Sequence, residues 1–211
     1  MRVIAIDGPS GSGKSTVART LAERLGLDYL DTGAMYRAVA FAALRRGVDP
    51  DDTAAVAAFV DALDLVPDGP RITVDGVDAS VDIRGPEVTS AVSFVARNPA
   101  VRASMVRRQR EWISAHGGGV VEGRDIGTEV WPDAELKVFL TADLAVRAAR
   151  RGEEIGHADT GAVAADLVRR DTIDSSRAVS PLTQADDAVV VDTTDCTIDD
   201  IVELLLGQLA S

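Results

Sequence analysis

The stretch VIAIDGPSGSGKS, residues 3–15, decides the fold of this chain. The apolar run of residues 3–6 is typical of a buried strand, and residues 15–25, which Gly26 follows, are typical of a helix. Between them, residues 8–15 match the phosphate-loop pattern G-x-x-x-x-G-K-[ST] in the strand-to-helix context that the pattern requires. The sequence therefore predicts a strand, a phosphate-binding loop and a helix, in that order.

The loop predicts a nucleoside triphosphate site, because its glycines let backbone N–H groups turn toward phosphate oxygens at a helix start. Lys14 would reach the β- and γ-phosphates, and the Ser15 hydroxyl would ligate Mg²⁺. A dinucleotide-binding interpretation fails, because that fingerprint orders its glycines as G-x-G-x-x-G and lacks the Lys-Ser pair. The residues that we expect to contact the triphosphate are Gly8, Pro9, Ser10, Gly11, Ser12, Gly13, Lys14, Ser15, Thr16 and Arg150.

The order of the predicted elements indicates an α/β protein. A second strand is expected at residues 27–30, followed by a helix at residues 34–46. Three further strands are expected at residues 120–122, 136–140 and 188–191, each apolar enough to be buried on both faces. A five-stranded parallel sheet is therefore the expected core.

Two regions depart from this pattern. Residues 62–90 contain turn signals around short segments, residues 71–74 and 79–84, that are typical of hairpin strands. Residues 150–180 are polar and interrupted by glycines, as expected of a mobile flap that contains a short helix.

Composition excludes several classes of protein. The 211 residues, 46% hydrophobic and 27% charged, indicate one compact unit that carries at most a small insertion. The net charge of −12 repels polyanions, so we expect no nucleic-acid or membrane partner. Cys196 is a single cysteine, and the apolar run near Met1 is too short for a signal peptide, so we expect a cytoplasmic protein. His116 and His157 lack metal-ligand spacing, so we expect no zinc site.

Arginines indicate a second anion site. Of 22 cationic side chains only Lys14 and Lys137 are lysine, although many of the arginines could simply be solvated. Arg37 follows the second predicted strand and the pair Arg124-Asp125 follows the third, and ligands of open α/β sheets bind at such strand ends. Planar guanidinium groups suit phosphate oxygens.

The flap has a charged helix face of its own. Arg170, Asp174 and Arg177 have the spacing i, i+4, i+7, which on a helix places them on one face. This face is either an exposed ion-pair ladder or a surface that closes over a phosphorylated ligand with hydroxyl groups. Arg147 and Arg151, beside Arg150 at the entrance of the flap, could contact ATP or be solvated.

Four stretches together carry a family resemblance: GPSGSGKST at residues 8–16, DTGAMYR at 31–37, GRDIGT at 123–128 and RDTIDSSRAVSPL at 170–182. In this order and spacing they resemble the motifs of the bacterial cytidylate kinases, which are nucleoside monophosphate kinases with a P-loop NTPase fold. The resemblance implies a core of residues 1–61, 91–150 and 179–211. It also implies an NMP-binding insertion at residues 62–90 and a lid at residues 151–178.

The resemblance also implies roles for individual residues. Ser93 and Arg102, whose stretch is weaker, could instead be a helix cap and a surface arginine. The acceptor site would comprise Thr32, Tyr36, Arg37, Ser93, Arg102, Arg124, Asp125, Arg170, Asp174 and Arg177. Within it Ser93, Arg102 and Asp125 would select cytosine. The catalytic residues would be Lys14, Arg124, Arg170 and Arg177.

The implied activity is Mg²⁺-dependent transfer of the ATP γ-phosphoryl group to CMP or dCMP by a monomer. Two alternatives remain at this point: a P-loop kinase of another small acceptor, and a nucleotide-dependent switch or binding module. The switch is disfavoured because the sequence offers no guanine-reading Asn-Lys-x-Asp element.

Overall fold

The computed structural model describes residues 1–156 and 159–210. The chain forms two compact units, whereas its length predicted one. The first unit comprises Met1–Tyr29 and Gly117–Ser211, and the second comprises Leu30–His116.

A five-stranded parallel sheet forms the centre of the fold, as predicted. Its order is β2-β6-β1-β7-β8, so the strand before the phosphate loop is central. The strands are β1 (Arg2–Asp7), β2 (Tyr29–Asp31), β6 (Gly118–Gly123), β7 (Leu136–Thr141) and β8 (Val189–Asp192). The β1–β6 and β1–β7 registers bring Asp7 beside Gly123 and Phe139, so the loops after these strands start at one edge of the sheet.

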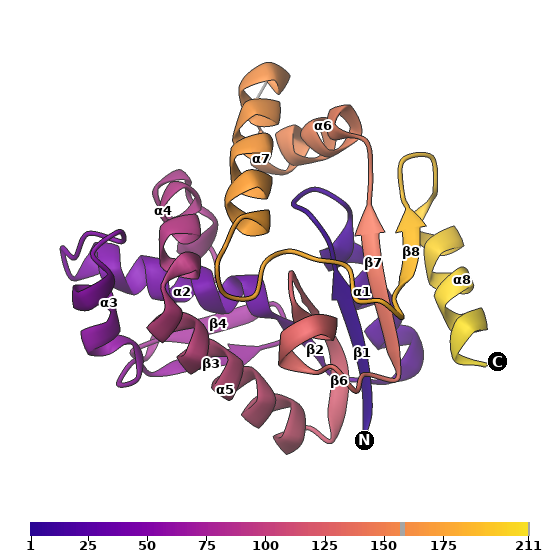
Figure 1. The fold of residues 1–211 in the computed structure, drawn as a ribbon, viewed down its shortest axis with the longest axis horizontal. Coiled ribbons are helices and arrows are strands. Elements are labelled where there is room, and N and C mark those ends of the chain that lie inside the picture. Colours follow the sequence, from indigo (N-terminus) through magenta and orange to yellow (C-terminus); the bar gives the residue numbers. More distant parts are fainter. Residues whose placement is uncertain (157–158, 211) are drawn as a thin grey trace. The chain divides into compact units, whose positions relative to one another are not determined.

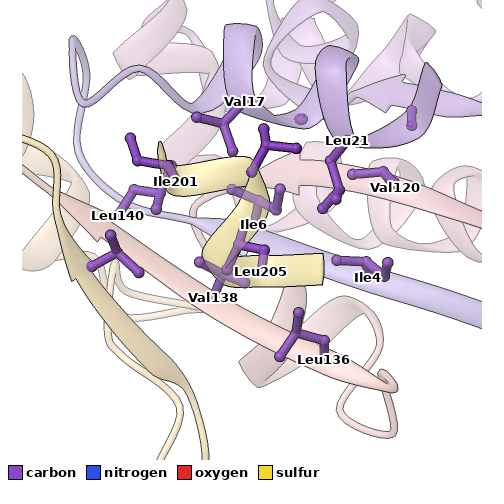
Figure 2. Close-up of a cluster of buried hydrophobic side chains, with 14 residues drawn as sticks. Ile4, Ile6, Val17, Leu21, Val120, Leu136, Val138, Leu140, Ile201 and Leu205 are labelled. Atoms are coloured by element: carbon purple, nitrogen blue, oxygen red, sulfur yellow. The ribbon is translucent and has the colours of Figure 1, made fainter. Parts of the chain in front are cut away.

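The core of the first unit fixes the position of the phosphate loop. Figure 2 shows Ile4 and Ile6 of β1 among buried side chains of α1 (Lys14–Leu25) and α8 (Ile198–Leu209). Each such side chain contributes about 1.5–3 kcal/mol on burial. Helix α1 ends at Gly26, whose left-handed backbone lets its N–H reach the carbonyls of the last turn. The elements on both sides of the loop are therefore anchored by apolar packing.

The flap region is more helical than predicted. It contains α6 (Leu144–Ile155) and α7 (Thr160–Ser175), which lie side by side in Figure 1 and share a small apolar cluster of Ala148, Val163 and Leu167. Because α7 ends at Ser175, the prediction that Arg177 lies on the same helix as Arg170 and Asp174 is wrong.

The second unit combines four helices with a small antiparallel sheet of order β3-β4-β5. Its helices are α2 (Thr32–Arg45), α3 (Thr53–Val60), α4 (Pro86–Arg97) and α5 (Pro99–Ala115). The strands are β3 (Leu65–Asp68), β4 (Arg71–Val74) and β5 (Val77–Asp78). The sheet lies within residues 62–90, while the extent of a substrate-binding insertion and of a lid stays a prediction.

One predicted strand of this unit is wrong. Residues 79–84 do not continue the sheet but turn into a short 3₁₀ helix, η1 (Asp82–Arg84). The cause is local, because the carboxylate of Asp78 accepts hydrogen bonds from both the N–H and the hydroxyl of Ser80. The chain consequently leaves the sheet at Ser80.

Within residues 1–156 and 159–210, no helix combines the length and the apolar character needed to cross a membrane.

Candidate active site

The phosphate loop connects β1 to α1 and depends on its glycines. Gly8, Gly11 and Gly13 have φ values of 145°, 78° and 85°, which side-chain-bearing residues rarely adopt. A Cβ at Gly8 would lie 2.1 Å from the Leu140 carbonyl oxygen, so β7 also excludes a side chain there. The loop amides are thus held in a curved, left-handed backbone of the kind that binds anions.

Lys14 is buried at the start of α1. Its Nζ donates to the Pro9 carbonyl at 2.6 Å and lies 3.5 Å from the Ser12 hydroxyl. The ammonium group is therefore held against the loop, where phosphate charge would be bound. Pro9, Ser10 and Ser12 lie in the loop as predicted, and Thr16 is exposed in the first turn of α1.

Glu122 is a site residue that the sequence analysis missed. It is buried at the end of β6, and its Oε2 accepts a hydrogen bond from the Ser15 hydroxyl at 3.0 Å. The Tyr29 hydroxyl donates to the other carboxylate oxygen. A carboxylate inside an otherwise apolar predicted strand was the signal that could have found it. A hydroxyl beside a carboxylate is a donor set that suits Mg²⁺, which prefers oxygen ligands.

Asp7 is a second residue that sequence reasoning missed. It is the last residue of β1, and its two carboxylate oxygens accept the N–H groups of Ile126 and Gly127 at 2.9 and 2.8 Å. Burial raises the pKa of Asp7 to about 6, although these hydrogen bonds oppose the shift. Asp7 thereby fixes the short π-helical turn η2 (Ile126–Val130), which follows Arg124 and the buried Asp125.

Arg124, Arg170, Asp174 and Arg177 are brought together in the first unit. Arg124 Nε donates to Asp174 Oδ2 at 2.9 Å, and Arg177 Nη1 lies 3.8 Å from Asp174 Oδ1. Arg177 thus reaches Asp174 even though it lies beyond α7. Burial and the nearby Arg124 lower the pKa of Arg170 to about 10. Burial alone would raise the pKa of Asp174, but the charges of Arg124 and Arg177 hold it below its usual value. The charges of three guanidinium groups, those of Arg124, Arg170 and Arg177, thus act on Asp174, and planar guanidinium groups of this kind suit phosphate oxygens.

Two of the three arginines of α6 connect to the phosphate loop. Arg150 donates to the hydroxyl and the carbonyl of Thr193 at 2.9 and 2.7 Å, and the Thr193 hydroxyl donates to the Ser12 carbonyl. Arg147 Nη1 donates to the Ser10 carbonyl at 3.1 Å. Arg151 instead pairs with Glu154 of its own helix.

The second unit places Thr32, Tyr36 and Arg37 on α2. Thr32 is buried at the start of the helix, and the preceding Asp31 caps the helix by accepting the Ala34 N–H at 2.9 Å. Arg37 Nη1 donates to the Ile83 carbonyl at 3.0 Å and to the Thr89 hydroxyl at 2.9 Å. These contacts fix one end of its guanidinium group.

Ser93 and Arg102 are both buried in this unit. Ser93 lies inside α4 rather than at a cap, and Arg102 is only 2% exposed. The two alternatives considered for them, a helix cap and a surface arginine, are therefore wrong. The Arg102 guanidinium carbon lies 5.4 Å from the centre of the Tyr36 ring, a cation–π contact that brings these two residues together.

Of the two histidines, His116 stacks on Trp112 with ring centres 4.0 Å apart, and His157 lies outside the described residues.

The fold and these contacts define a class of protein. A central strand that leads through a glycine-rich loop into a helix, with Lys14 on the loop and Ser15 beside a buried carboxylate, is the arrangement of P-loop nucleotide-binding proteins. The family model described as cytidylate kinase matches residues 4–211. The chain belongs to this family.

Proteins with similar sequences match nearly the whole chain. A cytidylate kinase from Mycolicibacterium paratuberculosis is 53% identical, and the match covers 96% of this chain and 92% of that protein. One from Streptomyces avermitilis is 49% identical, with 97% and 90% covered. A gluconokinase structure from Sinorhizobium meliloti 1021 has a TM-score of 0.52 at 18% identity and covers 99% of this chain and 91% of that chain, a likeness of fold alone.

Proposed function

We propose that this chain transfers the γ-phosphoryl group of ATP to the 5′-phosphate of CMP or dCMP, giving ADP and CDP or dCDP. The observation that carries the proposal is that positively charged side chains gather at two places in the first unit. Besides the phosphate loop with Lys14, the first unit holds a second group of cations, Arg124, Arg170 and Arg177, whose charges act on Asp174. Two cationic sites suit a reaction between two phosphorylated molecules.

The donor site in this proposal consists of residues 8–16 and Arg150. Lys14 would contact the β- and γ-phosphates, and its present 2.6 Å bond to the Pro9 carbonyl would be exchanged for phosphate oxygens. Ser15, whose hydroxyl bonds Glu122, would ligate Mg²⁺, and Glu122 would orient that hydroxyl and add negative charge beside the ion. Mg²⁺ would neutralise part of the negative charge on the γ-phosphoryl group during transfer.

The acceptor site in this proposal consists of the residues that the family resemblance implies. Arg37 and Arg124 would hold the CMP phosphate, while Arg170, Asp174 and Arg177 would reach its sugar and phosphate. Thr32 and Tyr36 would border this site. Ser93 and Arg102 would donate to the cytosine ring nitrogen and carbonyl, and Asp125 would accept from the amino group. Ser93, Arg102 and Asp125 are all buried. Their burial supports this assignment, because polar side chains in a protein interior are often retained to bind a ligand.

The chemistry requires positioning more than proton transfer. The acceptor phosphate is already an anionic nucleophile, so no strong general base is needed. The main obstacle is repulsion between two polyanions, which Lys14 and the converging arginines would offset. Residues 151–178 would act as a lid that excludes water and thereby suppresses hydrolysis of ATP. Residues 62–90 would form the NMP-binding insertion, and residues 1–61, 91–150 and 179–211 the core.

We also propose a monomeric cytoplasmic enzyme without nucleic-acid or membrane partners. The net charge of −12 supports the absence of polyanionic partners, and the single cysteine supports a cytoplasmic protein. The short chain and the family resemblance favour a monomer.

The direct test is the stoichiometry of products. Purified protein is incubated with Mg·ATP and CMP, and nucleotides are separated by anion-exchange chromatography. We expect ADP and CDP in a one-to-one ratio and little ADP when CMP is omitted. ADP released at equal rates with and without CMP would instead favour the nucleotide-dependent switch, and transfer to a sugar hydroxyl but not to CMP would favour a kinase of another acceptor.

A further inference from the structure

One guanidinium group joins three segments of the first unit. Arg147 of α6 donates from Nε to the Ala142 carbonyl, just beyond β7, at 3.1 Å. Its Nη1 donates to the Ser10 carbonyl of the phosphate loop at 3.1 Å and to Asp171 Oδ2 of α7 at 2.6 Å. The Arg147 side chain therefore touches the end of a core strand, the phosphate loop and the helix that carries Arg170 and Asp174.

The backbone of Arg147 also packs closely against the phosphate loop. A Cβ at Gly11 would lie 2.8 Å from the Arg147 carbonyl oxygen and 3.0 Å from its Cβ, so the first turns of α6 approach the loop as closely as a glycine permits. This contact and the two carbonyl bonds hold Arg147 on the loop side independently of α7. The bond to Asp171 is then the only one of the guanidinium bonds named above that reaches α7.

Asp171 links the position of α7 to Arg147. It directly follows Arg170 and precedes Asp174 by three residues, one turn of the same helix. Its Oδ2 bonds Arg147, whereas its Oδ1 is buried with no hydrogen-bond partner among the described residues. The one hydrogen bond given above for this carboxylate therefore leads to the phosphate loop, while its charge also acts on Arg124.

We propose that Asp171 is a positioning residue which, through Arg147, couples the placement of Arg170 and Asp174 to the conformation of the phosphate loop. The inference rests on the proposed function and deepens it, because it assigns the route by which the lid helix and the donor site act together. The pair is partly buried, with side chains 11% and 21% exposed, so solvent weakens it less than it weakens a surface ion pair.

The coupling predicts a particular kinetic signature. Asp171→Asn keeps the shape of the side chain but removes the charge, while Arg147 keeps its bonds to the Ser10 and Ala142 carbonyls. The loop should therefore still bind ATP, and the KM for ATP should change less than about threefold. The kcat with CMP should fall about tenfold, because the amide oxygen of the asparagine accepts from Arg147 without the negative charge that strengthens this bond. ATP hydrolysis without CMP should rise relative to transfer.

The matched control is Asp166→Asn. Asp166 lies on the same helix and pairs with Arg169 at 2.6 Å, but this pair is exposed and lies within α7. The control variant should retain the kcat of the parent enzyme. A double-mutant cycle then tests the route: in an Arg147→Met background, Asp171→Asn should have no further effect on kcat.

The outcomes separate this inference from the proposed function. Equal kcat values for Asp171→Asn and Asp166→Asn, or additive effects of Arg147→Met and Asp171→Asn, would overturn the inference while the parent enzyme still converts CMP. Absence of CMP phosphorylation by the parent enzyme would overturn the proposed function instead. If Asp171→Asn lost its helical circular dichroism, Asp171→Glu would replace it. Recovery of kcat in the charge-retaining variant would support the coupling, and a tenfold loss in it would contradict it.

Discussion

The buried carboxylate of Asp7 makes the stability of the fold depend on pH in a defined way. The pKa of Asp7 is raised from 3.8 to about 6 in the folded protein. Between pH 3.8 and pH 6 the folded protein therefore keeps the Asp7 proton, whereas the unfolded chain has lost it. The contribution of this group is most favourable below pH 3.8 and is lost as the pH rises through 6. A shift of about two pKa units corresponds to about 3 kcal/mol. About 2 kcal/mol of this falls between pH 4 and pH 7.

Asp7→Asn removes this dependence. An asparagine keeps one oxygen for the Ile126 or Gly127 N–H but turns an N–H₂ toward the other, so the variant loses one hydrogen bond, about 1 kcal/mol, at every pH. The free energy of unfolding of the variant relative to the parent should therefore rise by about 2 kcal/mol from pH 4 to pH 7.

The assay is urea unfolding followed by circular dichroism at several pH values, with Asp195→Asn, a change at an exposed carboxylate, as the control. The relative stability of the control should stay constant over this range. A constant difference between Asp7→Asn and the parent protein would refute the assignment of a raised pKa to Asp7.

Three further changes test the donor site. Lys14→Ala removes the cation held at the loop and should abolish most turnover, by at least a hundredfold in kcat with CMP in a coupled ADP assay, so near-normal kcat would contradict its role. Glu122→Gln keeps an acceptor for the Ser15 hydroxyl but removes the charge, so a Mg²⁺ titration of activity should show a half-saturating concentration about tenfold higher, and an unchanged value would argue against a role near the metal. Gly8→Ala places a Cβ 2.1 Å from the Leu140 carbonyl oxygen and should lower the melting temperature by several degrees and weaken ATP binding in calorimetry, whereas parent-like values would contradict the close approach of loop and β7.

The sequence predicted the sheet and the phosphate loop because their signals are local. The apolar run before Gly8 is buried on both faces, and the left-handed glycines lie where the motif requires them. The family resemblance is confirmed by a match over residues 4–211. The roles of the individual acceptor-site residues stay predictions, although the structure buries Ser93 and Arg102 and joins Arg124 to Asp174.

Some of the features that the sequence did not reveal depend on contacts between distant residues, and others depend on local side-chain contacts that the apolar pattern does not indicate. Glu122 and Asp7 are functional candidates because of partners 107 and 119 or more positions away. The apolar strand around Glu122 marks this residue as unusual, but the sequence does not indicate the partners of either carboxylate. Residues 79–84 alternate like a strand, but the Asp78–Ser80 hydrogen bonds turn the chain away from the sheet. Arg177 lies beyond the end of α7, but its side chain is long enough for the guanidinium group to approach the Asp174 carboxylate.

The most direct test of the proposed activity is a comparison of acceptors. ADP formation from Mg·ATP is measured with CMP, dCMP, UMP, AMP and GMP at one concentration, and without acceptor. The proposed function predicts fast turnover with CMP and dCMP, slower turnover with UMP and negligible turnover otherwise. Preference for AMP or GMP would leave the phosphate loop in place but contradict the assignment of a cytosine site to Ser93, Arg102 and Asp125.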